Sequence, residues 1–481
     1  MNHKMVFRTV GKIVLAEAAM LLLPTFISLL YGENCIWSFL ITIAVALVIG
    51  GALVLGLRPK DKVIYAKEGF VIVALAWLSL SLIGALPFTI SGEIPSYIDA
   101  VFETVSGFTT TGASILTDVE SMSYGLLFWR SFTHWVGGMG VLVFAMAIIP
   151  DFSDRSIHIL RAEVPGPTVG KLVPRMKDTA KILYLIYIVM TVTEIILLLC
   201  GGMPLFDSVV HSMGTAGTGG FGVKADSIGG YSPYLQWVIG IFMLLFGVNF
   251  NLYYLLLIRQ FKLVFKSGEL WAYIGIATAA VVLICVNIWP LYEEFSEVLR
   301  QSFFQVSSIL TTTGYSTTDF NQWPDFSKAI LLLLMCIGGC AGSTAGGIKV
   351  SRVVMIFKQI GSELQHMLHP RSVKVVHFEG KKVDQQTLHG VGVYLMIYVL
   401  CLAAVTLVVS LDPFGLETNL SAAMACFNNI GPGLGIVGPA GSYAAYSDLS
   451  KAMLTFAMLF GRLEIFPMLL FFSPATWSKK G

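Results

Sequence analysis

Charge is scarce in this sequence. Asp, Glu, Lys and Arg make up only 12% of its 481 residues, and the net charge is +2, whereas soluble globular domains are about one-quarter charged. A chain with so small a basic excess lacks the electrostatic footprint of a nucleic-acid-binding protein, so no nucleic-acid partner is expected. The seven cysteines are scattered without CxxC spacing, which indicates neither a disulfide framework nor a zinc site. The sequence also lacks HExxH and any grouped Ser, His and Asp, so we expect neither an enzyme nor an organic cofactor.

Apolar residues are what the sequence has instead. They make up 56% of the chain, and the mean hydropathy is +0.77. The apolar runs 15–30, 36–57 and 182–199 are about as long as the ~20 residues that a helix needs to cross a bilayer. Composition therefore predicts an all-α protein that crosses a membrane many times.

The basic residues are unevenly distributed along the chain. Twenty-five of the 31 Lys and Arg residues fall in the segments 1–12, 58–67, 155–181, 259–266, 349–382 and 479–480. The alternate loops carry most of the acidic residues. By the positive-inside rule, both termini are predicted to be cytoplasmic and the acidic loops to face outward. We expect an acidic outer vestibule that concentrates cations; the alternative is that these acids only solvate the loops.

A unit of helix, short half-helix with loop, and helix recurs four times. Its central segments lie at 99–114, 207–222, 298–316 and, most divergent, 418–435. The first three share one plan: an acidic or polar start, a short amphipathic run and a Thr- and Gly-rich turn. The predicted divisions are two extra N-terminal helices at 1–67, then repeats at 68–160, 161–266, 267–370 (with a broken second helix) and 371–481. This predicts four parallel repeats around a central pore, with ten full spans and four half-helices.

The half-helices are too short to cross a membrane, since about ten residues give only about 15 Å of helix. A re-entrant segment is tolerated only where protein or water satisfies its backbone. Four such segments are therefore expected to face one another around a wet axis.

The turns carry the predicted ion-binding chemistry. Glycine can adopt backbone angles that point successive carbonyl groups toward a common axis. Rings of such carbonyls replace the hydration shell of a monovalent cation, and the turns contain no acidic ring of the kind expected for a divalent cation. The predicted filter residues are Thr110, Thr111, Gly112 and Ala113; Thr218, Gly219, Gly220 and Phe221; Thr312, Thr313, Gly314 and Tyr315; and Asn429, Ile430, Gly431 and Pro432.

The sequence resembles the Trk/Ktr/HKT superfamily of potassium transporters. The resemblance rests on these turns, on the two extra N-terminal helices and on the runs 129–140, 338–349, 428–435 and 461–467. Within this superfamily, the sequence is most similar to the bacterial Trk-type membrane subunit. The resemblance implies uptake of K⁺, and of Rb⁺, across the bacterial cytoplasmic membrane. It also implies a homodimer in membrane lipid, gated by a cytoplasmic ring of TrkA-like nucleotide-binding subunits. The second and fourth turns depart from a potassium-channel sequence, so modest selectivity is expected.

A gate is predicted just beneath the filter. Five of the ten residues in 338–347 are glycines, within an apolar segment, so a flexible loop is expected near mid-membrane. Arg462 is expected at a similar depth, where a buried cation requires a partner or water. The alternatives are close helix packing for the glycines, and for Arg462 a structural pair with Glu464 or with loop carbonyls. The predicted gate residues are Gly338, Gly339, Gly342, Ser343, Thr344, Gly346, Gly347 and Arg462.

The rival function is a proton- or sodium-coupled secondary transporter. Glu17 and Glu194 are its candidate proton-relay carboxylates; the alternative is that they pair helices or brace the filter. Coupled transporters commonly use inverted repeats, whereas the four loops here all enter from the acidic side. His134 and His211 are expected to be structural hydrogen-bonding residues. The basic segments 155–181 and 349–382 are expected to dock the cytoplasmic partner, or else anionic lipid headgroups.

Overall fold

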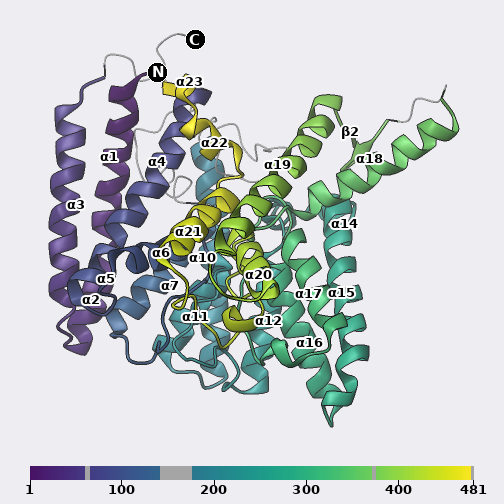
Figure 1. Ribbon diagram of the computed structural model, residues 1–481, viewed down its shortest axis with the longest axis horizontal. Helices are drawn as coiled ribbons and strands as arrows, with labels where there is room; N and C mark the ends of the chain where they lie inside the picture. Colours follow the sequence, from purple (N-terminus) through teal and green to yellow (C-terminus); the bar gives the residue numbers. More distant parts are fainter. Residues whose placement is uncertain (60–64, 141–175, 371–374, 478–481) are drawn as a thin grey trace.

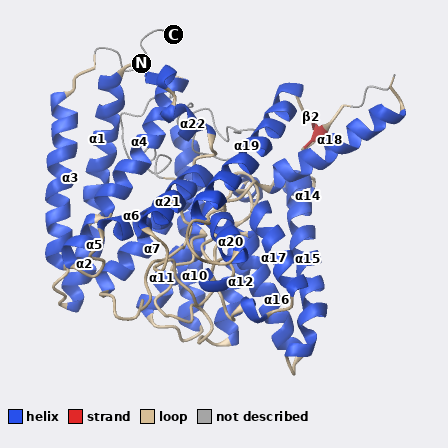
Figure 2. Cartoon of the chain, viewed as in Figure 1, coloured by secondary structure: helices blue, strands red, loops and turns tan. Residues whose placement is uncertain are grey.

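The computed structural model describes residues 1–59, 65–140, 176–370 and 375–477. The regular secondary structure of this part of the chain is helical, apart from one antiparallel hairpin of β1 (His377–Phe378) and β2 (Lys381–Lys382) (Figure 2). The all-α membrane fold predicted from composition is confirmed.

The N-terminal helices form one side of the bundle (Figure 1, purple). They are α1 (His3–Met20), α2 (Leu22–Tyr31) and α3 (Ile36–Gly56). Helices α1 and α3 approach closely because Gly11 and Gly50 face the partner helix: a Cβ on Gly11 would lie 2.7 Å from the Cβ of Leu53. Small residues at helix contacts are typical of packing in membranes, where a close approach of backbones supplies the attraction.

Four repeats of helix, short helix and helix follow. The first helices are α4 (Ala66–Gly84) with α5 (Leu86–Ser91), α10 (Met176–Cys200), α15 (Gly268–Ile288) and α19 (Gln385–Val409). The short pore helices are α6 (Tyr97–Phe108), α11 (Leu205–Gly217), α16 (Phe295–Leu310) and α20 (Leu416–Phe427). The second helices are α7 (Tyr124–Gly138), α12 (Pro233–Phe246) with α13 (Phe250–Leu257), α17 (Asp325–Ile337) with α18 (Val350–Leu368), and α21 (Asp448–Arg462) with α22 (Phe466–Phe472). The remaining elements are α14 (Phe261–Phe265), α23 (Pro474–Trp477) and the 3₁₀ turns Trp289–Leu291, Phe320–Gln322 and Gly435–Val437.

The second helices of the repeats are interrupted more often than predicted, since the sequence indicated ten full spans with a break only in the third repeat. Within the described residues, six helices are long and apolar enough to cross a membrane: the two N-terminal ones and the first helix of each repeat. Of the second helices, α12 and α13 meet at 91°, α17 and α18 are separated by residues 338–349, and α21 and α22 by residues 463–465. Positive φ angles at Glu464 and Ile465 end α21, because a right-handed helix requires φ near about −60°. Only the break in the third repeat was predicted.

The two ends of the described chain lie on the same side of the bundle (Figure 1). The rings of His3 and Trp477 stack with centroids 6.1 Å apart. Helix α18 leaves the bundle on this same side and extends beyond it (Figure 1). This arrangement leaves α18 and the β1–β2 hairpin accessible from the side on which the termini lie.

Candidate ion pathway

The four pore helices end in the same backbone cap. Thr110, Thr218, Thr312 and Asn429 have φ angles of 55°, 54°, 57° and 58°. In each repeat the next N–H donates to the carbonyl five residues earlier, at 2.8 Å: Thr111 to Ser106, Gly219 to Gly214, Thr313 to Ser308 and Ile430 to Ala425. This is the Schellman pattern, in which glycine is the usual left-handed residue. A β-branched threonine in this conformation is strained, and such strain persists where the surroundings demand one geometry.

The turns after these caps meet around a single axis. The glycine two residues after each left-handed residue also has positive φ: 79° at Gly112, 78° at Gly220, 86° at Gly314 and 96° at Gly431. A Cβ on Gly112, Gly220 or Gly314 would collide with the carbonyl oxygen of Gly219, Thr313 or Ile430, respectively. A Cβ on Gly431 would lie 2.7 Å from the carbonyl oxygen of Thr111. Each repeat therefore touches the next, and the fourth touches the first.

The ring is closed by the backbone carbonyl at the second position of each turn. These carbonyls belong to Thr111, Gly219, Thr313 and Ile430. All four turn glycines also line one cavity of about 120 Å³. Among the described residues, no group of three or more His, Cys, Asp or Glu side chains is placed to hold a metal ion, and the oxygens that lie against the turn glycines are backbone carbonyls. Uncharged carbonyl rings suit a monovalent cation.

The residues at the fourth position of each turn support the ring. The Tyr315 hydroxyl donates to the carbonyls of His211 (3.1 Å) and Phe221 (3.0 Å). The Tyr315 carbonyl itself accepts from the Ser308 hydroxyl at 2.6 Å. The carbonyls of Phe221 and Tyr315 are thus already engaged within the protein. Ala113 and Pro432 occupy the equivalent positions and line the same cavity.

The cavity itself is not acidic. Its lining includes Lys224 and Arg130, and among the described residues that line it there is no Asp or Glu. Glu103, which the loop pattern placed among the outward acids, is only 1% exposed. Glu103 therefore belongs to a buried contact and does not contribute to the expected acidic vestibule, which stays a prediction for the other loop acids.

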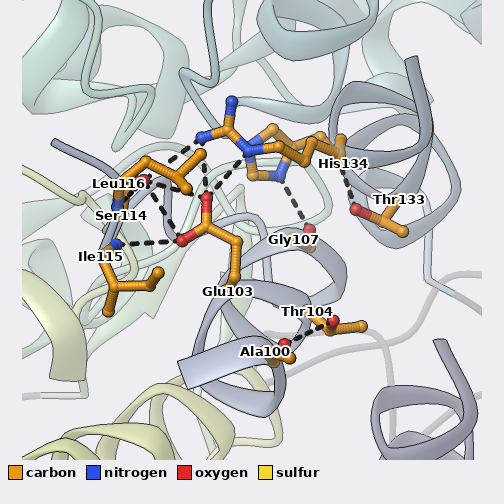
Figure 3. A network of polar contacts seen from close by, with 10 residues as sticks. Ala100, Glu103, Thr104, Gly107, Ser114, Ile115, Leu116, Thr133 and His134 are labelled. Carbon is orange, nitrogen blue, oxygen red and sulfur yellow. Dashed lines mark hydrogen bonds and ion pairs between the residues drawn. The ribbon is translucent and has the colours of Figure 1, made fainter. Parts of the chain in front are cut away.

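That contact is a network between α6 and α7 (Figure 3). Glu103 accepts from the Ser114 hydroxyl (2.9 Å), the Ile115 N–H (3.0 Å) and Arg130 Nε (2.8 Å). The Arg130 guanidinium also lies 4.0 Å over the ring of Phe221. One buried pair therefore connects the segment after the first turn to the second turn. Sequence reasoning missed Arg130, although an ionisable residue inside an apolar segment was the available signal.

Both histidines make the hydrogen bonds expected of structural residues. His134 Nδ1 lies 2.7 Å from the Gly107 carbonyl (Figure 3), and His211 Nδ1 lies 2.8 Å from the Asp207 carbonyl. The ring of His134 also packs on Phe221, with centroids 4.2 Å apart. The contacts of His134 connect α7 to the first pore helix and to the second turn, whereas the hydrogen bond of His211 lies within α11.

The glycine-rich segment 338–349 forms a loop directly against the filter turns. The Gly346 N–H donates to the Thr312 hydroxyl at 2.6 Å. A Cβ on Gly346 would meet the Asn428 carbonyl and lie 3.2 Å from the Cβ of Asn429. The loop therefore occupies the space beside the third and fourth turns, and its glycines are required there by close approach. All seven predicted gate residues of this loop lie in it.

The bend between α12 and α13 holds the loop from one side. The Gly247 carbonyl accepts from the Cys340 N–H (2.9 Å), and the Phe246 carbonyl accepts from the Thr344 hydroxyl (3.2 Å). The Phe250 N–H donates to the Gly342 carbonyl at 3.0 Å. The backbone groups that lack a helical hydrogen-bond partner at the bend therefore find partners in the loop.

Arg462 holds the loop from the opposite side. Its Nη1 donates to the Thr344 carbonyl at 2.9 Å, and its Nη2 donates to the carbonyls of Gly137 and Gly138 at 2.6 and 2.8 Å. The guanidinium thereby joins the loop to the end of α7. The carboxylate of Glu464 pairs with Arg352 of α18 at 2.5 Å, and Arg352 also lies 4.1 Å over the ring of Tyr394.

A carboxylate on α15 forms a third attachment. Glu269 Oε1 accepts from the Ala341 N–H at 2.6 Å. The N–H of Glu269 in turn donates to Glu379 of the β1–β2 hairpin at 2.9 Å. A chain of two hydrogen bonds therefore leads from a surface hairpin to the loop, and sequence reasoning missed both acids because their partners are far away in the chain.

Glu17 and Glu194 lie away from the axis. Both are fully buried, on α1 and α10, and neither lines the cavity at the turns. Glu17 contacts the back of the first repeat: a Cβ on Gly84 would lie 3.1 Å from Glu17 Oε1 and from the Thr104 methyl group. Glu194 lies beside Thr215 of the second pore helix and close to Tyr315 of the third turn.

Comparison with known proteins gives a consistent result along the whole chain. Residues 36–479 match the sequence model of the TrkH family, described as cation transport protein. The chain is 37% identical to the Trk system potassium uptake protein TrkH of Salmonella typhimurium (strain LT2), over 99% of this chain and 100% of that protein. It is 36% identical, with the same coverage, to the protein of that name from Escherichia coli (strain K12). Its structure matches the crystal structure of the potassium transporter TrkH from Vibrio parahaemolyticus with a TM-score of 0.90 and 32% identity, over 99% of this chain and 100% of that one.

Proposed function

Because this chain belongs to the TrkH family of cation transport proteins, we propose that it takes up K⁺, and Rb⁺ with it, through a pore on the axis of its four repeats. Its relatives are named potassium uptake proteins. One observation carries the proposal: each turn glycine lies so close to a carbonyl of the neighbouring repeat that no Cβ fits without a collision or a contact of 2.7 Å. The backbone oxygens of four repeats are thereby held around one path.

Selectivity comes from these carbonyls in the proposed mechanism. They replace the water that a K⁺ ion loses on entry. The C-terminal ends of the four pore helices point at the same place, and their partial negative charge stabilises the ion. The second turn has Gly219, and the fourth has Ile430, where the first and third have threonine. This asymmetry supports modest discrimination of K⁺ over Na⁺.

The loop 338–349 and Arg462 form the gate in this proposal. The loop contacts Thr312 of the third turn, so it stands where an ion leaving the filter would pass. Arg462 holds it through Thr344 and places a positive charge nearby, which repels cations strongly in a region of low dielectric constant. Opening requires the loop to leave its contacts with Arg462, with the α12–α13 bend and with Glu269.

A cytoplasmic TrkA-like ring is the proposed cause of that movement. The surface that supports docking includes α18 and the β1–β2 hairpin, which lie on the side of the termini and carry Lys358, Lys381 and Lys382. Residues 155–175 of the other predicted docking segment lie outside the described residues. The proposal also includes cytoplasmic termini, a homodimer and the bacterial cytoplasmic membrane. Reversal of Lys381 and Lys382 to Glu should abolish co-purification with the ring, and unchanged recovery would remove the hairpin from the docking surface.

The deciding experiment is K⁺ and Rb⁺ flux into liposomes that contain the purified chain, with the membrane potential clamped. A pore gives flux that stops at the electrochemical equilibrium of K⁺. Accumulation beyond that equilibrium, driven by a proton or sodium gradient, would instead establish the coupled transporter, with Glu17 and Glu194 as its first candidates. Absence of K⁺ flux both with and without the ring would overturn the proposal.

A further inference from the structure

An apolar pocket of about 560 Å³ lies between α12, α13, α15 and α16, outside the ion pathway. Its volume is within the roughly 300–1,000 Å³ typical of small-molecule sites. Its lining is almost entirely hydrocarbon and includes Leu245, Val248, Leu252, Tyr273, Ala277 and Val306. The pocket exists because α12 and α13 meet at 91°, which leaves a wedge that a straight helix would fill.

The pocket opens toward the lipid-facing wall of the bundle. Ile274 and Val282 of α15 line it and are 42% and 54% exposed. Helix α15 is one of the six helices long and apolar enough to cross the membrane, so these side chains face hydrocarbon and not water. The surrounding solvent is therefore acyl chains.

One end of the pocket reaches a basic, aromatic rim. Val264 of α14 lines the pocket and is flanked in the chain by Lys262 and Lys266, both exposed. Beside them, Phe265 is 64% and Trp271 is 54% exposed. Exposed aromatic and basic residues together are typical of the membrane interface, and lysines there attract anionic lipid headgroups.

We propose that this pocket binds one acyl chain of an anionic phospholipid, with the phosphate group held by Lys262 and Lys266, and that this lipid stabilises the closed gate. The occupant is specified by two features that coincide: a hydrocarbon-lined cavity open to the bilayer and a positive rim at its interfacial end. A water-soluble anion would suit the basic rim but not the hydrocarbon lining.

The connection to the gate is the bend itself. Its inner face donates to and accepts from the loop through Gly247 and Phe250, while its outer face, at Val248 and Leu252, lines the pocket. An acyl chain in the wedge occupies the space that α13 would need in order to straighten. The bend and its contacts with the loop are therefore retained while the lipid is bound. The effect of the lipid on the gate rests on the proposed function of the loop, whereas the binding of the lipid does not.

Binding is tested by photolabelling the full chain in liposomes with phosphatidylglycerol that carries a diazirine in its acyl chain. Labelled peptides should come from α12, α13 and α15, and Ala277→Phe, which fills the pocket, should reduce this labelling several-fold. The Lys262→Gln, Lys266→Gln double variant should reduce it as well, whereas the Lys4→Gln, Arg58→Gln double variant, with the same change of charge on α1 and just after α3, should not. Phosphatidylcholine with the same photoreactive chain should label the pocket less.

Several results would overturn the binding site: labelling that Ala277→Phe leaves unchanged, labelling confined to other helices, or protection of the pocket by a second copy of the chain. The last would appear as efficient disulfide formation between copies of an Ile274→Cys variant. If Ala277→Phe is poorly folded, Thr278→Trp fills the same pocket from its exposed rim and replaces it.

The effect on gating has a separate readout. Basal K⁺ flux should be several-fold lower in liposomes that contain phosphatidylglycerol than in phosphatidylcholine alone, and Ala277→Phe should give the low value in both. Pocket labelling without any such difference in flux would remove the gating role and leave the lipid site. Labelling together with no K⁺ flux in any lipid would contradict the proposed function, not the site.

Discussion

Arg130 Nη2 lies 2.7 Å from Glu103 Oε1, and the two side chains are 2% and 0% exposed. The pair joins the first pore helix to the helix that follows it, and the guanidinium covers Phe221 of the second turn. A buried ion pair contributes to stability only when its remaining hydrogen-bonding groups are satisfied. Here Ser114 and Ile115 supply two of them, so the pair also fixes the segment that leaves the first turn.

Removing one partner should therefore be costly. Glu103→Gln leaves Arg130 buried and without its counter-charge, which should lower the free energy of unfolding by about 3–5 kcal/mol. The double variant Glu103→Gln, Arg130→Met should lose clearly less, because no unpaired charge remains. Thermal melting of the purified proteins in detergent checks both. Equal losses in the two variants would mean that packing, not charge, dominates the site.

Serine at a turn glycine should reduce selectivity. At Gly220 or Gly314 a side chain would collide with the carbonyl of Thr313 or Ile430 and would have to adopt φ of 78° or 86°. We expect Gly220→Ser and Gly314→Ser to shift reversal potentials toward that of sodium. Gly222→Ala is the matched control, since its nearest new contact is His211 Nε2 at 3.4 Å. Unchanged permeability ratios in both serine variants would remove these glycines from the filter.

Loss of the Arg462 charge should open the gate. Arg462→Ala removes three hydrogen bonds to the carbonyls of Thr344, Gly137 and Gly138. Basal K⁺ flux without the ring should rise several-fold. Arg462→Lys retains the charge but not the planar fork of donors, so an intermediate flux is expected. Parent-level flux in a well-folded Arg462→Ala protein would reduce Arg462 to a structural brace.

The attachment at Glu269 gives a separate test of the loop. Glu269→Ala removes the acceptor of the Ala341 N–H and should also increase basal flux. Glu269→Gln preserves a neutral acceptor at the same atom and should stay closer to the parent. Liposome flux measures both variants. An alanine variant no leakier than the glutamine variant would show that this hydrogen bond does not hold the gate.

Lys224 should slow entry from the outside. It lines the cavity at the turns, where its charge opposes an approaching cation. Lys224→Gln should raise K⁺ conductance at low ionic strength, and the gain should shrink above about 0.1 M salt, where the Debye length is only about 10 Å. Lys328→Gln is the control, because Lys328 pairs with Asp325 at 2.8 Å and does not line the cavity. Equal effects of the two substitutions would exclude a local role for Lys224.

Much of the architecture could be predicted from the sequence because it is local. Hydropathy and turn composition indicate four copies of a short helix followed by a glycine turn, and the four aligned turns have the same φ pattern in the structure. The position of Arg462 in its apolar segment indicated a cation that needs oxygen partners. These properties depend only on residues a few positions apart.

Contacts between distant segments were decided by the tertiary structure. The breaks after Phe246 and Arg462 were not predictable, because a helix in a membrane ends only where other groups satisfy its freed backbone, and those groups belong to segments such as the loop about 95 residues further along. The same holds for Glu103, which is a loop acid by sequence and a buried ion-pair partner by fold. The sequence by itself determined that the chain is a fourfold-repeated membrane protein. Which carbonyl faces which glycine, and which charge is buried, followed only from packing, since burial and hydrogen-bond satisfaction are properties of neighbours in space.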